Sequence, residues 1–309
     1  YETPVDPATI PPNAQFNFKP LGNGANINAA PCVNEGFEAG NLSGWVANMG
    51  QNSNSCLYPT TTGTVSFPST SLNVVTLPFS DPLIGTIPLS PFSGNKALKI
   101  NDANLSFNGD VVRVRQNFNV TGTNFLYEFA YKSVMATAHP CCQQTYMRVA
   151  LRNSFGTLLA CPIFTFAPPI GGTVSCSSPG IAWTNTSIAT GQGVFAVAFN
   201  PTWQKYSIDL TQYIGTSISV EVSVADCSPT GHWGYVYFDS NCNSLGFTLT
   251  TPSTGTTYIP APSQTVNIAA VCAQTATLSA PAGLGPYVWN GPPGSGITSN
   301  TNQVISTNV

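Results

Sequence analysis

The sequence predicts an all-β protein: a jelly-roll β-sandwich followed by an incomplete Ig-like β-sandwich. Charged residues make up 7% of the chain, whereas a typical soluble domain has roughly 25% and long helices usually display Glu and Lys. Glycine (27 residues) and proline (26 residues) divide the chain into short segments, which is typical of strands joined by turns. From residue 96 onward, apolar and polar residues alternate with the period of two that strands have.

The first third of the chain carries weaker strand signals. Residues 1–31 are rich in Pro, Asn and Gly and read as an extended arm, with one alternation at Gln15–Phe18. Residues 33–48 predict a short strand, a turn and a second strand. Residues 51–94 are rich in Ser, Thr and Pro and read as loops, with a strand at Leu72–Thr76.

The middle of the chain predicts a strand-only domain. Phe125–Lys132 places four aromatic side chains on one face and a mixed set, including Glu128 and Lys132, on the other. Residues 162–192 read as irregular, and Leu210–Ile214 as one helical turn. The other predicted strands are Lys96–Ile100, Val111–Phe118, Thr145–Asn153, Thr157–Cys161, Gly193–Phe199, Gln204–Asp209, Ile218–Val224 and Trp233–Asp239. A strand-only domain of this length with long connections is typical of a jelly-roll sandwich.

The C-terminal part predicts a second, smaller unit. We expect an arm at 1–31, the jelly roll at 32–245, a linker at 246–263 and a partial Ig-like domain at 264–309. An Ig-type sandwich needs roughly seven strands, and only four segments qualify: Thr265–Ala269, Gln274–Ala280, Pro286–Trp289 and Gln303–Ser306.

The cysteines indicate an oxidising, extracellular environment. The chain has nine cysteines, no Cys-x-x-Cys pair and two histidines, so disulfides are favoured over a Cys/His metal site. We expect eight cysteines to pair within the jelly roll and Cys272 to have its partner beyond Val309. The eight are Cys32, Cys56, Cys141, Cys142, Cys161, Cys176, Cys227 and Cys242. Their connectivity does not follow from the sequence.

Charge and hydropathy exclude two function classes. The nine Lys and Arg residues are scattered and the formal net charge is −3, which argues against nucleic-acid binding. No apolar run reaches the 18 residues of a membrane span. A protein that is kept soluble by uncharged polar groups suits a secreted or cell-surface location. Because few residues are charged, electrostatic repulsion between copies of the chain is small. We therefore expect homo-oligomeric contacts, or contacts with neighbouring domains of the same large protein.

Several motifs resemble a known family. Asn34–Glu38 with Ser43-Gly44-Trp45, then Ser93–Leu98, then Gly231–Asp239, resemble the opening, middle and closing strands of carbohydrate-binding-like jelly rolls. Trp203 with Ile208–Leu210 and Ala225–Cys227 are similar to the versions found in giant surface proteins of gliding, Bacteroidota-type bacteria exported by type IX secretion. The tail from Val271 resembles their Ig-like or PKD-like repeats.

The resemblance implies an adhesin or surface-filament architecture and a structural calcium ion between the first and last strands. Glu38 and Asp239 occupy the matching positions, with Gly36 and Asn95 as carbonyl candidates. The alternative is that both acids cap turns. Because the first and last strands are neighbours in such jelly rolls, the resemblance also implies a Cys32–Cys242 disulfide.

The candidate catalytic residues have simpler structural explanations. Glu128 and Glu221 fall on polar strand faces, as the paired carboxylates of a glycosidase would, but cross-strand charge pairs with Lys132, Arg148 and Arg152 explain them more simply. His139, His232 and Asp226 lack a Gly-x-Ser-x-Gly motif, so we expect the histidines to anchor loops by hydrogen bonds. No enzyme is predicted.

Aromatic residues offer a sugar-binding alternative, since flat rings stack on pyranoses. Trp45, Trp203 and Trp289 read as core residues. Trp183, in an irregular loop, and Trp233, at a strand start, are the candidate ligand-binding residues; they could instead pack against a disulfide. The sequence thus favours a non-enzymatic structural or adhesive segment of a large secreted surface or filament protein, with a carbohydrate-binding module as the alternative.

Overall fold

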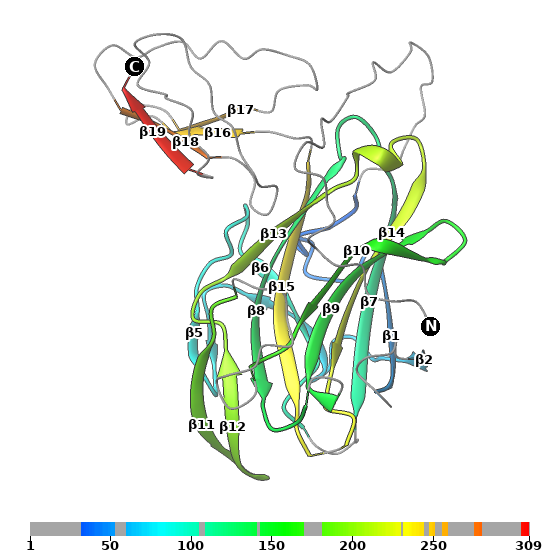
Figure 1. Ribbon diagram of the computed structural model, residues 1–309, viewed down its shortest axis with the longest axis vertical. Helices are drawn as coiled ribbons and strands as arrows, with labels where there is room; N and C mark the ends of the chain where they lie inside the picture. Colours follow the sequence, from blue (N-terminus) through cyan, green and yellow to red (C-terminus); the bar gives the residue numbers. More distant parts are fainter. Residues whose placement is uncertain are drawn as a thin grey trace.

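The computed structural model describes residues 32–52, 60–104, 109–140, 143–169, 181–229 and 231–243, and four short strands between 247 and 308. The fold is all-β, with two antiparallel sheets packed face to face (Figure 1). One sheet has the order β10-β9-β14-β7-β1-β2 and the other the order β11-β12-β8-β15-β6-β3, with β13 also paired to β8. No helix in the described residues is long and apolar enough to cross a membrane.

The strand bounds match most of the predicted alternation. The six-stranded sheet comprises β1 (Trp45–Gln51), β2 (Thr60–Thr64), β7 (Asp110–Asn119), β9 (Tyr146–Asn153), β10 (Leu158–Phe166) and β14 (Ser217–Ala225). The other sheet comprises β3 (Leu72–Thr76), β6 (Lys96–Ile100), β8 (Leu126–Ala136), β11 (Thr184–Thr190), β12 (Gly193–Phe199), β13 (Gln204–Asp209) and β15 (Gly234–Asn243). The predicted helical turn is present at Thr211–Tyr213.

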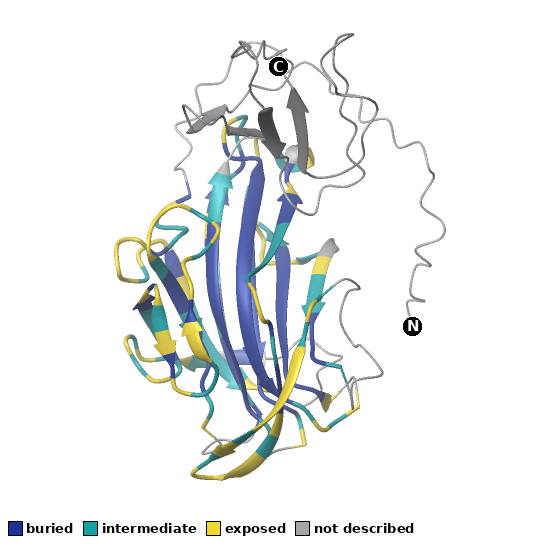
Figure 2. Ribbon diagram, turned by 90° about the vertical axis from the view of Figure 1, so that its left-hand side faces the viewer, coloured by how far each residue is buried: buried dark blue, intermediate teal, exposed yellow. Residues whose placement is uncertain are grey.

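The space between the two sheets holds the main hydrophobic core. Val114, Val149 and Val222 from one sheet meet Phe129 and Phe238 from the other, and all five side chains are at most 1% exposed. Alternation explains this arrangement because every second residue of a strand faces the same side. Figure 2 shows the resulting band of buried strands through the middle of the molecule.

A second core lies on the outer face of the seven-stranded sheet. Here Trp233, Tyr235 and Tyr237 pack with Leu77 and Ile87, which come from the segment that contains the hairpin β4 (Phe79–Asp81) and β5 (Gly85–Ile87). Every residue of β8 is therefore buried, where the sequence predicted one mixed, outward face. Polar residues on that face find internal partners: the Lys132 ammonium donates to the carbonyl oxygens of Asn200 and Pro201, at 2.5 and 2.7 Å.

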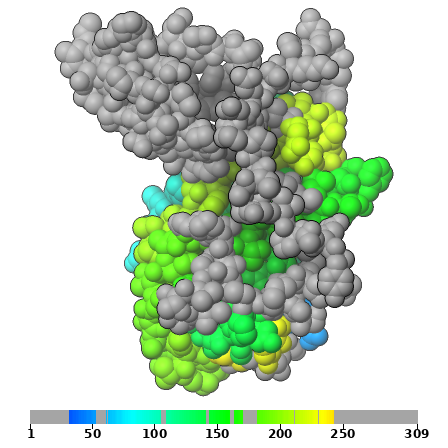
Figure 3. Space-filling view, viewed as in Figure 1, coloured from blue at the N-terminus to red at the C-terminus, as the bar shows by residue number. Residues whose placement is uncertain are grey.

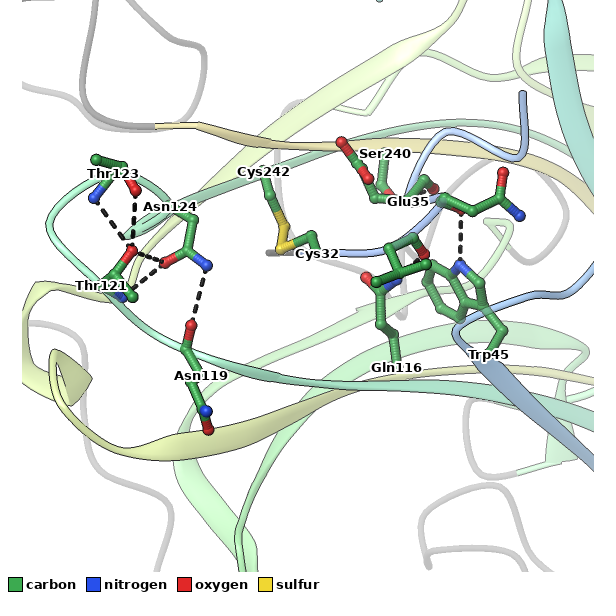
Figure 4. Close-up of a disulfide and its surroundings, with 12 residues drawn as sticks. Cys32, Glu35, Trp45, Gln116, Asn119, Thr121, Thr123, Asn124, Ser240 and Cys242 are labelled. Atoms are coloured by element: carbon green, nitrogen blue, oxygen red, sulfur yellow. Dashed lines mark hydrogen bonds between the residues drawn. A yellow bond between two sulfur atoms is a disulfide. The ribbon is translucent and has the colours of Figure 1, made fainter. Parts of the chain in front are cut away.

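The start of the jelly roll is clamped to its last strand (Figure 4). Cys32 and Cys242 form a disulfide across 210 residues of sequence, the pairing that the family resemblance implied. Beside it, the Gln116 amide donates to the Val33 carbonyl at 2.7 Å and the Ser240 hydroxyl donates to the Glu35 carbonyl at 2.8 Å. The remaining predicted disulfides involve residues whose side chains lie outside the described part, apart from Cys227.

Several elements differ from the prediction. Strands β2, β4, β5 and β11 form in segments that read as loops or irregular chain. The predicted linker contains β16 (Phe247–Thr250) and β17 (Gly255–Tyr258), which join β18 (Thr275–Ser279) and β19 (Val304–Asn308) in a four-stranded sheet. Thr and Tyr tolerate strand geometry as well as loops, so their abundance there did not distinguish the two. The arm at 1–31, Thr265–Ala269 and Pro286–Trp289 lie outside the described residues.

The long loop closed by Cys32–Cys242 yields a stability prediction. A Cys32→Ser/Cys242→Ser double variant should lose about 3–5 kcal/mol of unfolding free energy, because the cross-link restricts an unfolded loop of 210 residues. Urea unfolding measures the loss, and Cys272→Ser serves as the control with no expected change. An unchanged urea midpoint in the double variant would contradict the role given to this bond.

Candidate ligand-binding site

A cavity of about 370 Å³ opens beside the outer face of the seven-stranded sheet. Its walls come from the β4–β5 hairpin, β6, the loop that follows β6, the β11–β12 turn and β15. The polar residues that line it are Asp81, Lys99, Asp102, Asn104, Gln192 and Tyr235, with Thr70 and Thr190 at its edges. The β11–β12 hairpin, labelled in Figure 1, carries much exposed surface.

Asp81 fixes one wall of this cavity. Its carboxylate is buried and accepts the hydroxyl groups of Tyr235 and Tyr237, at 2.8 and 2.6 Å. The other carboxylate oxygen accepts the backbone N–H groups of Leu83 and Ile84, at 2.8 and 2.9 Å. Burial, together with the nearby Asp81, raises the pKa of both tyrosines, so they remain proton donors. Asp81 therefore ties the β4–β5 turn to strand β15.

Lys99, on β6, lines the cavity beside Tyr235. Its ammonium lies 4.7 Å from the centre of the Tyr235 ring, a cation–π contact. Burial lowers the pKa of Lys99, and the negative charges of Asp102 and Asp81 oppose that shift. Asp102 accepts the Ser71 hydroxyl at 2.6 Å and the Asn104 N–H at 2.8 Å. Asp102 thereby fixes the loop that follows β6, close to Lys99.

The rim consists of exposed amides. Gln192 in the β11–β12 turn donates to the Asn104 side-chain oxygen at 3.2 Å, which joins two loops that are 88 residues apart. The ionisable residues of the lining are one lysine and two aspartates, so the cavity offers no positive surplus for an anion. Pro82, Leu83 and Ala103 supply apolar surface beside these amides and the ammonium. This combination suits a neutral ligand that has both C–H faces and hydroxyl groups.

The predicted sugar-stacking tryptophans are not exposed platforms. Trp233 is 0% exposed and stacks on Tyr235, with ring centres 5.9 Å apart, so the expectation that its ring is available to a ligand is wrong. Trp183 is partly buried against the main core. Both tryptophans directly precede a strand, β11 or β15, and their side chains point toward a core. The sequence alone does not give that direction. Trp45, expected in the core, is 6% exposed.

The two glutamates of the glycosidase reading lie on different sheets, Glu128 on β8 and Glu221 on β14. Arg152 pairs with Glu221 through two nitrogens, at 2.8 and 3.1 Å, and Lys205 pairs with Glu128 at 2.8 Å. The expected charge pairs are therefore correct for Arg152. Lys132 instead donates to backbone carbonyls, and Arg148 donates to the Thr165 hydroxyl at 3.1 Å.

The residues of the implied calcium site lie near one another. A Cβ added to Gly36 would lie 3.3 Å from a carboxylate oxygen of Asp239 and 4.0 Å from Glu38 Cγ. Burial, followed by weaker effects that include the charges of Glu38 and Glu35, raises the pKa of Asp239 to about 7. A buried carboxylate beside two others suits a hard cation, so these residues fit in type.

Two features of this region also match the alternative reading, in which the acids cap turns. Glu38 accepts the backbone N–H groups of Asn95 and Lys96, at 3.1 and 2.9 Å, and a Cβ on Gly94 would collide with its carboxylate. The Asn95 carbonyl already accepts the Leu77 N–H at 2.7 Å. Of the four predicted ligands, Asn95 is therefore the one with the weakest fit.

The two histidines, which the sequence analysis expected to anchor loops by hydrogen bonds, contact each other across two loops. His139 Nε2 and His232 Nδ1 are 2.8 Å apart, and Cys227 Sγ is 3.8 Å from the same His232 nitrogen. Burial and the neighbouring His139 lower the pKa of His232. Asp226 is separate from this cluster in its bonding: it accepts from the Asn101 amide and the Gly234 N–H, at 3.0 and 3.1 Å.

No protein-family model and no curated protein matches the chain. Similar solved structures include TmCBM61 in complex with β-1,4-galactotriose, at 13% identity and TM-score 0.34 over 68% of this chain and 97% of that one. The enzymatically active domain of bacteriophage CBA120 tailspike protein 4 is 9% identical, with TM-score 0.31 over 67% of this chain and 21% of that one. A carbohydrate-binding module of the β-sandwich superfamily is 9% identical, with TM-score 0.27 over 66% and 58%. At these values the likenesses assign no functional residue to this chain.

The bonding of Asp81 predicts a large effect of its removal. Asp81→Ala should lower the unfolding free energy by about 3 kcal/mol, because two buried hydroxyls and two N–H groups lose their acceptor. Thermal or urea unfolding measures the change. The neighbouring exposed Ser80→Ala should shift stability by less than about 0.5 kcal/mol. Equal stability of the two variants would contradict the anchoring role.

Proposed function

We propose that this chain is a non-enzymatic glycan-binding module of a secreted or cell-surface protein, and that its ligand occupies the cavity framed by Asp81, Lys99, Asn104 and Gln192. The observation that carries the proposal is the cavity itself, about 370 Å³ in volume, in which five elements bring amide, hydroxyl and ammonium groups together with apolar side chains. A sugar residue presents hydroxyls at several angles, and such a lining can pair with them.

The contacts favour a neutral sugar held mainly by hydrogen bonds. The Tyr235 ring already carries the Lys99 ammonium on one face, so it is not a bare stacking surface. Asp81 and Asp102 balance Lys99, which disfavours acidic sugars. Among the exposed large hydrophobic side chains of the described residues, the aromatic one is Phe155. Phe155 lies in the turn between β9 and β10. In Figure 3 a green segment projects from the body of the molecule.

The wider setting is proposed from the sequence resemblance. We place the module in an adhesin or surface filament of the Bacteroidota type that is exported by type IX secretion. The disulfide between the ends of the jelly roll and the 7% charged residues support an extracellular location. Homo-oligomeric contacts, or contacts with neighbouring domains of the same protein, would suit such an assembly; sedimentation of the chain with and without residues 1–31 tests them. The separate ion pairs of Glu128 and Glu221 support a non-enzymatic role.

We further propose that calcium is a structural cofactor held by Glu38, Asp239 and the Gly36 carbonyl, with Asn95 contributing less. The ion would join the first turn of the jelly roll to its last strand and offset the repulsion between the buried carboxylate of Asp239 and the exposed carboxylate of Glu38. It takes no part in the binding of sugar.

The glycan-binding proposal is tested on an array of neutral and acidic glycans, followed by calorimetry with the best neutral ligand. Asn104→Ala and Gln192→Ala each remove an exposed rim amide, so the fold should be retained. Each variant should weaken binding about tenfold, the equivalent of one lost hydrogen bond of roughly 1.4 kcal/mol.

Phe155→Ala is the matched control, since Phe155 is 90% exposed and outside the cavity. Its affinity should equal that of the unmodified chain. If Phe155→Ala abolishes binding while the rim variants bind normally, the site is the β9–β10 turn and the assignment of the cavity is wrong. An array with no neutral ligand would contradict the proposed function itself.

Calcium removal gives a separate prediction. After dialysis against EDTA, adding Ca²⁺ should raise the unfolding temperature by several degrees, because the ion binds the folded state. Asp239→Asn should abolish this increase, while Asp209→Asn, on exposed chain, should keep it. An unfolding temperature that is independent of Ca²⁺ would show that calcium is not a structural cofactor of this chain.

A further inference from the structure

Three potential metal ligands meet at one end of the sandwich, outside the cavity described above. His139 lies in the loop between β8 and β9, while Cys227 and His232 lie in the loop between β14 and β15. The side-chain ligand atoms of all three lie within 4.8 Å of one another. These two loops are about 90 residues apart in the sequence, so the cluster is a product of the fold.

Backbone hydrogen bonds hold the two loops in register. The Cys227 N–H donates to the His232 carbonyl at 3.0 Å, which closes the β14–β15 loop and sets both side chains on one side. The Ser228 N–H donates to the Gln143 carbonyl at 3.2 Å, and the Gln143 N–H donates to the Pro140 carbonyl at 2.8 Å. The cluster is therefore positioned by main-chain contacts that do not involve the three ligand atoms.

The spacing matches a tetrahedral metal site. With zinc–nitrogen bonds of about 2.0–2.1 Å and a zinc–sulfur bond of about 2.3 Å, tetrahedral angles separate two nitrogens by about 3.3 Å and nitrogen from sulfur by about 3.6 Å. The distances here are 2.8 Å between the histidine nitrogens and 3.8 Å from Cys227 sulfur to His232. The His139 and Cys227 ligand atoms lie within 4.8 Å of each other. An ion would therefore need the two histidine rings to separate by about half an ångström and His139 to approach Cys227, movements that half-buried histidine side chains can make.

We propose that His139, Cys227 and His232 form a binding site for a borderline-soft divalent ion of the zinc class. Two imidazoles and one thiolate are the donors that Zn²⁺ selects, whereas Ca²⁺ takes oxygen ligands. On binding, the histidine whose ligating nitrogen carries the proton of the hydrogen bond shifts to its other tautomer, by exchange with solvent, so that both rings bind as neutral imidazoles. The Cys227 thiol releases its proton to solvent. The site cross-links the β8–β9 and β14–β15 loops and keeps a fourth position for water or another donor. A disulfide at Cys227, as expected from the sequence, is the competing account, and the peptide map below decides between the two.

The test uses the intact chain, freed of metal by a chelator, with Co²⁺ and Zn²⁺ as probes. Co²⁺ should produce the thiolate charge-transfer band and the intense visible bands of a tetrahedral sulfur-ligated site, and Zn²⁺ should abolish them. His139→Gln, at a half-buried position, should weaken Zn²⁺ binding at least about tenfold, since even partners outside the first coordination shell contribute 10–100-fold. Cys227→Ser should remove the charge-transfer band.

A fold check of the variants and a competition with Ca²⁺ complete the test. Cys227 is fully buried, so the Cys227→Ser variant could misfold, and far-ultraviolet circular dichroism checks its fold. The Zn²⁺ affinity of the half-buried His139→Gln variant therefore decides whether the proposal holds. Excess Ca²⁺ should leave the Co²⁺ spectrum unchanged. A spectrum without sulfur-to-cobalt bands, unchanged Zn²⁺ affinity in His139→Gln, or a peptide map that finds Cys227 in a disulfide would each overturn the proposal.

Discussion

The carboxylate of Asp81 is the constraint on which the candidate site depends. It gathers two tyrosine hydroxyls and two backbone N–H groups at 2.6–2.9 Å and so fastens the β4–β5 hairpin over strand β15. Without that fastening, the outer face of the seven-stranded sheet would expose the aromatic residues of its second core. With it, the hairpin becomes a wall, and the space between this wall and the β11–β12 turn becomes the cavity. The same bonds thus serve packing and the shape of the site.

A chain with few charges uses other means to hold its polar groups. Lys132 is bonded to carbonyls and Glu221 to two arginines. The first residues of the jelly roll are bonded to the last strand by a disulfide and by the Ser240 hydroxyl. The hydrogen bonds and ion pairs among these contacts satisfy polar groups that would otherwise carry a desolvation penalty. The strands of the two sheets are thus held together, and the loops between them carry the exposed amides of the candidate site.

Alternation with a period of two located β3, β6, β7, β8, β9, β12, β13, β14 and β15 from the sequence, because half-buried strands impose it. The same argument missed β4 and β5, whose three residues are too few to show a period, and it misjudged the outer face of β8, which is covered by a distant hairpin. The candidate site escaped prediction because its residues are spread from Thr70 to Tyr235. The Asp81-Pro82 pair, typical of a turn, was its one local signal. Trp233 was misassigned because a tryptophan at the start of a strand can point to either side. The pairing of His139 with His232 depends on loop positions that no local pattern records.

Hydrogen exchange of the chain with a bound neutral oligosaccharide tests the central claim most directly, since it locates the ligand without altering the protein. The account predicts slower exchange at the N–H groups of residues 81–84, 102–104 and 190–192, which surround the cavity, and no change at the β9–β10 turn. Slower exchange confined to residues 153–157, or spread evenly over the sandwich, would contradict the claim that this cavity is the glycan-binding site.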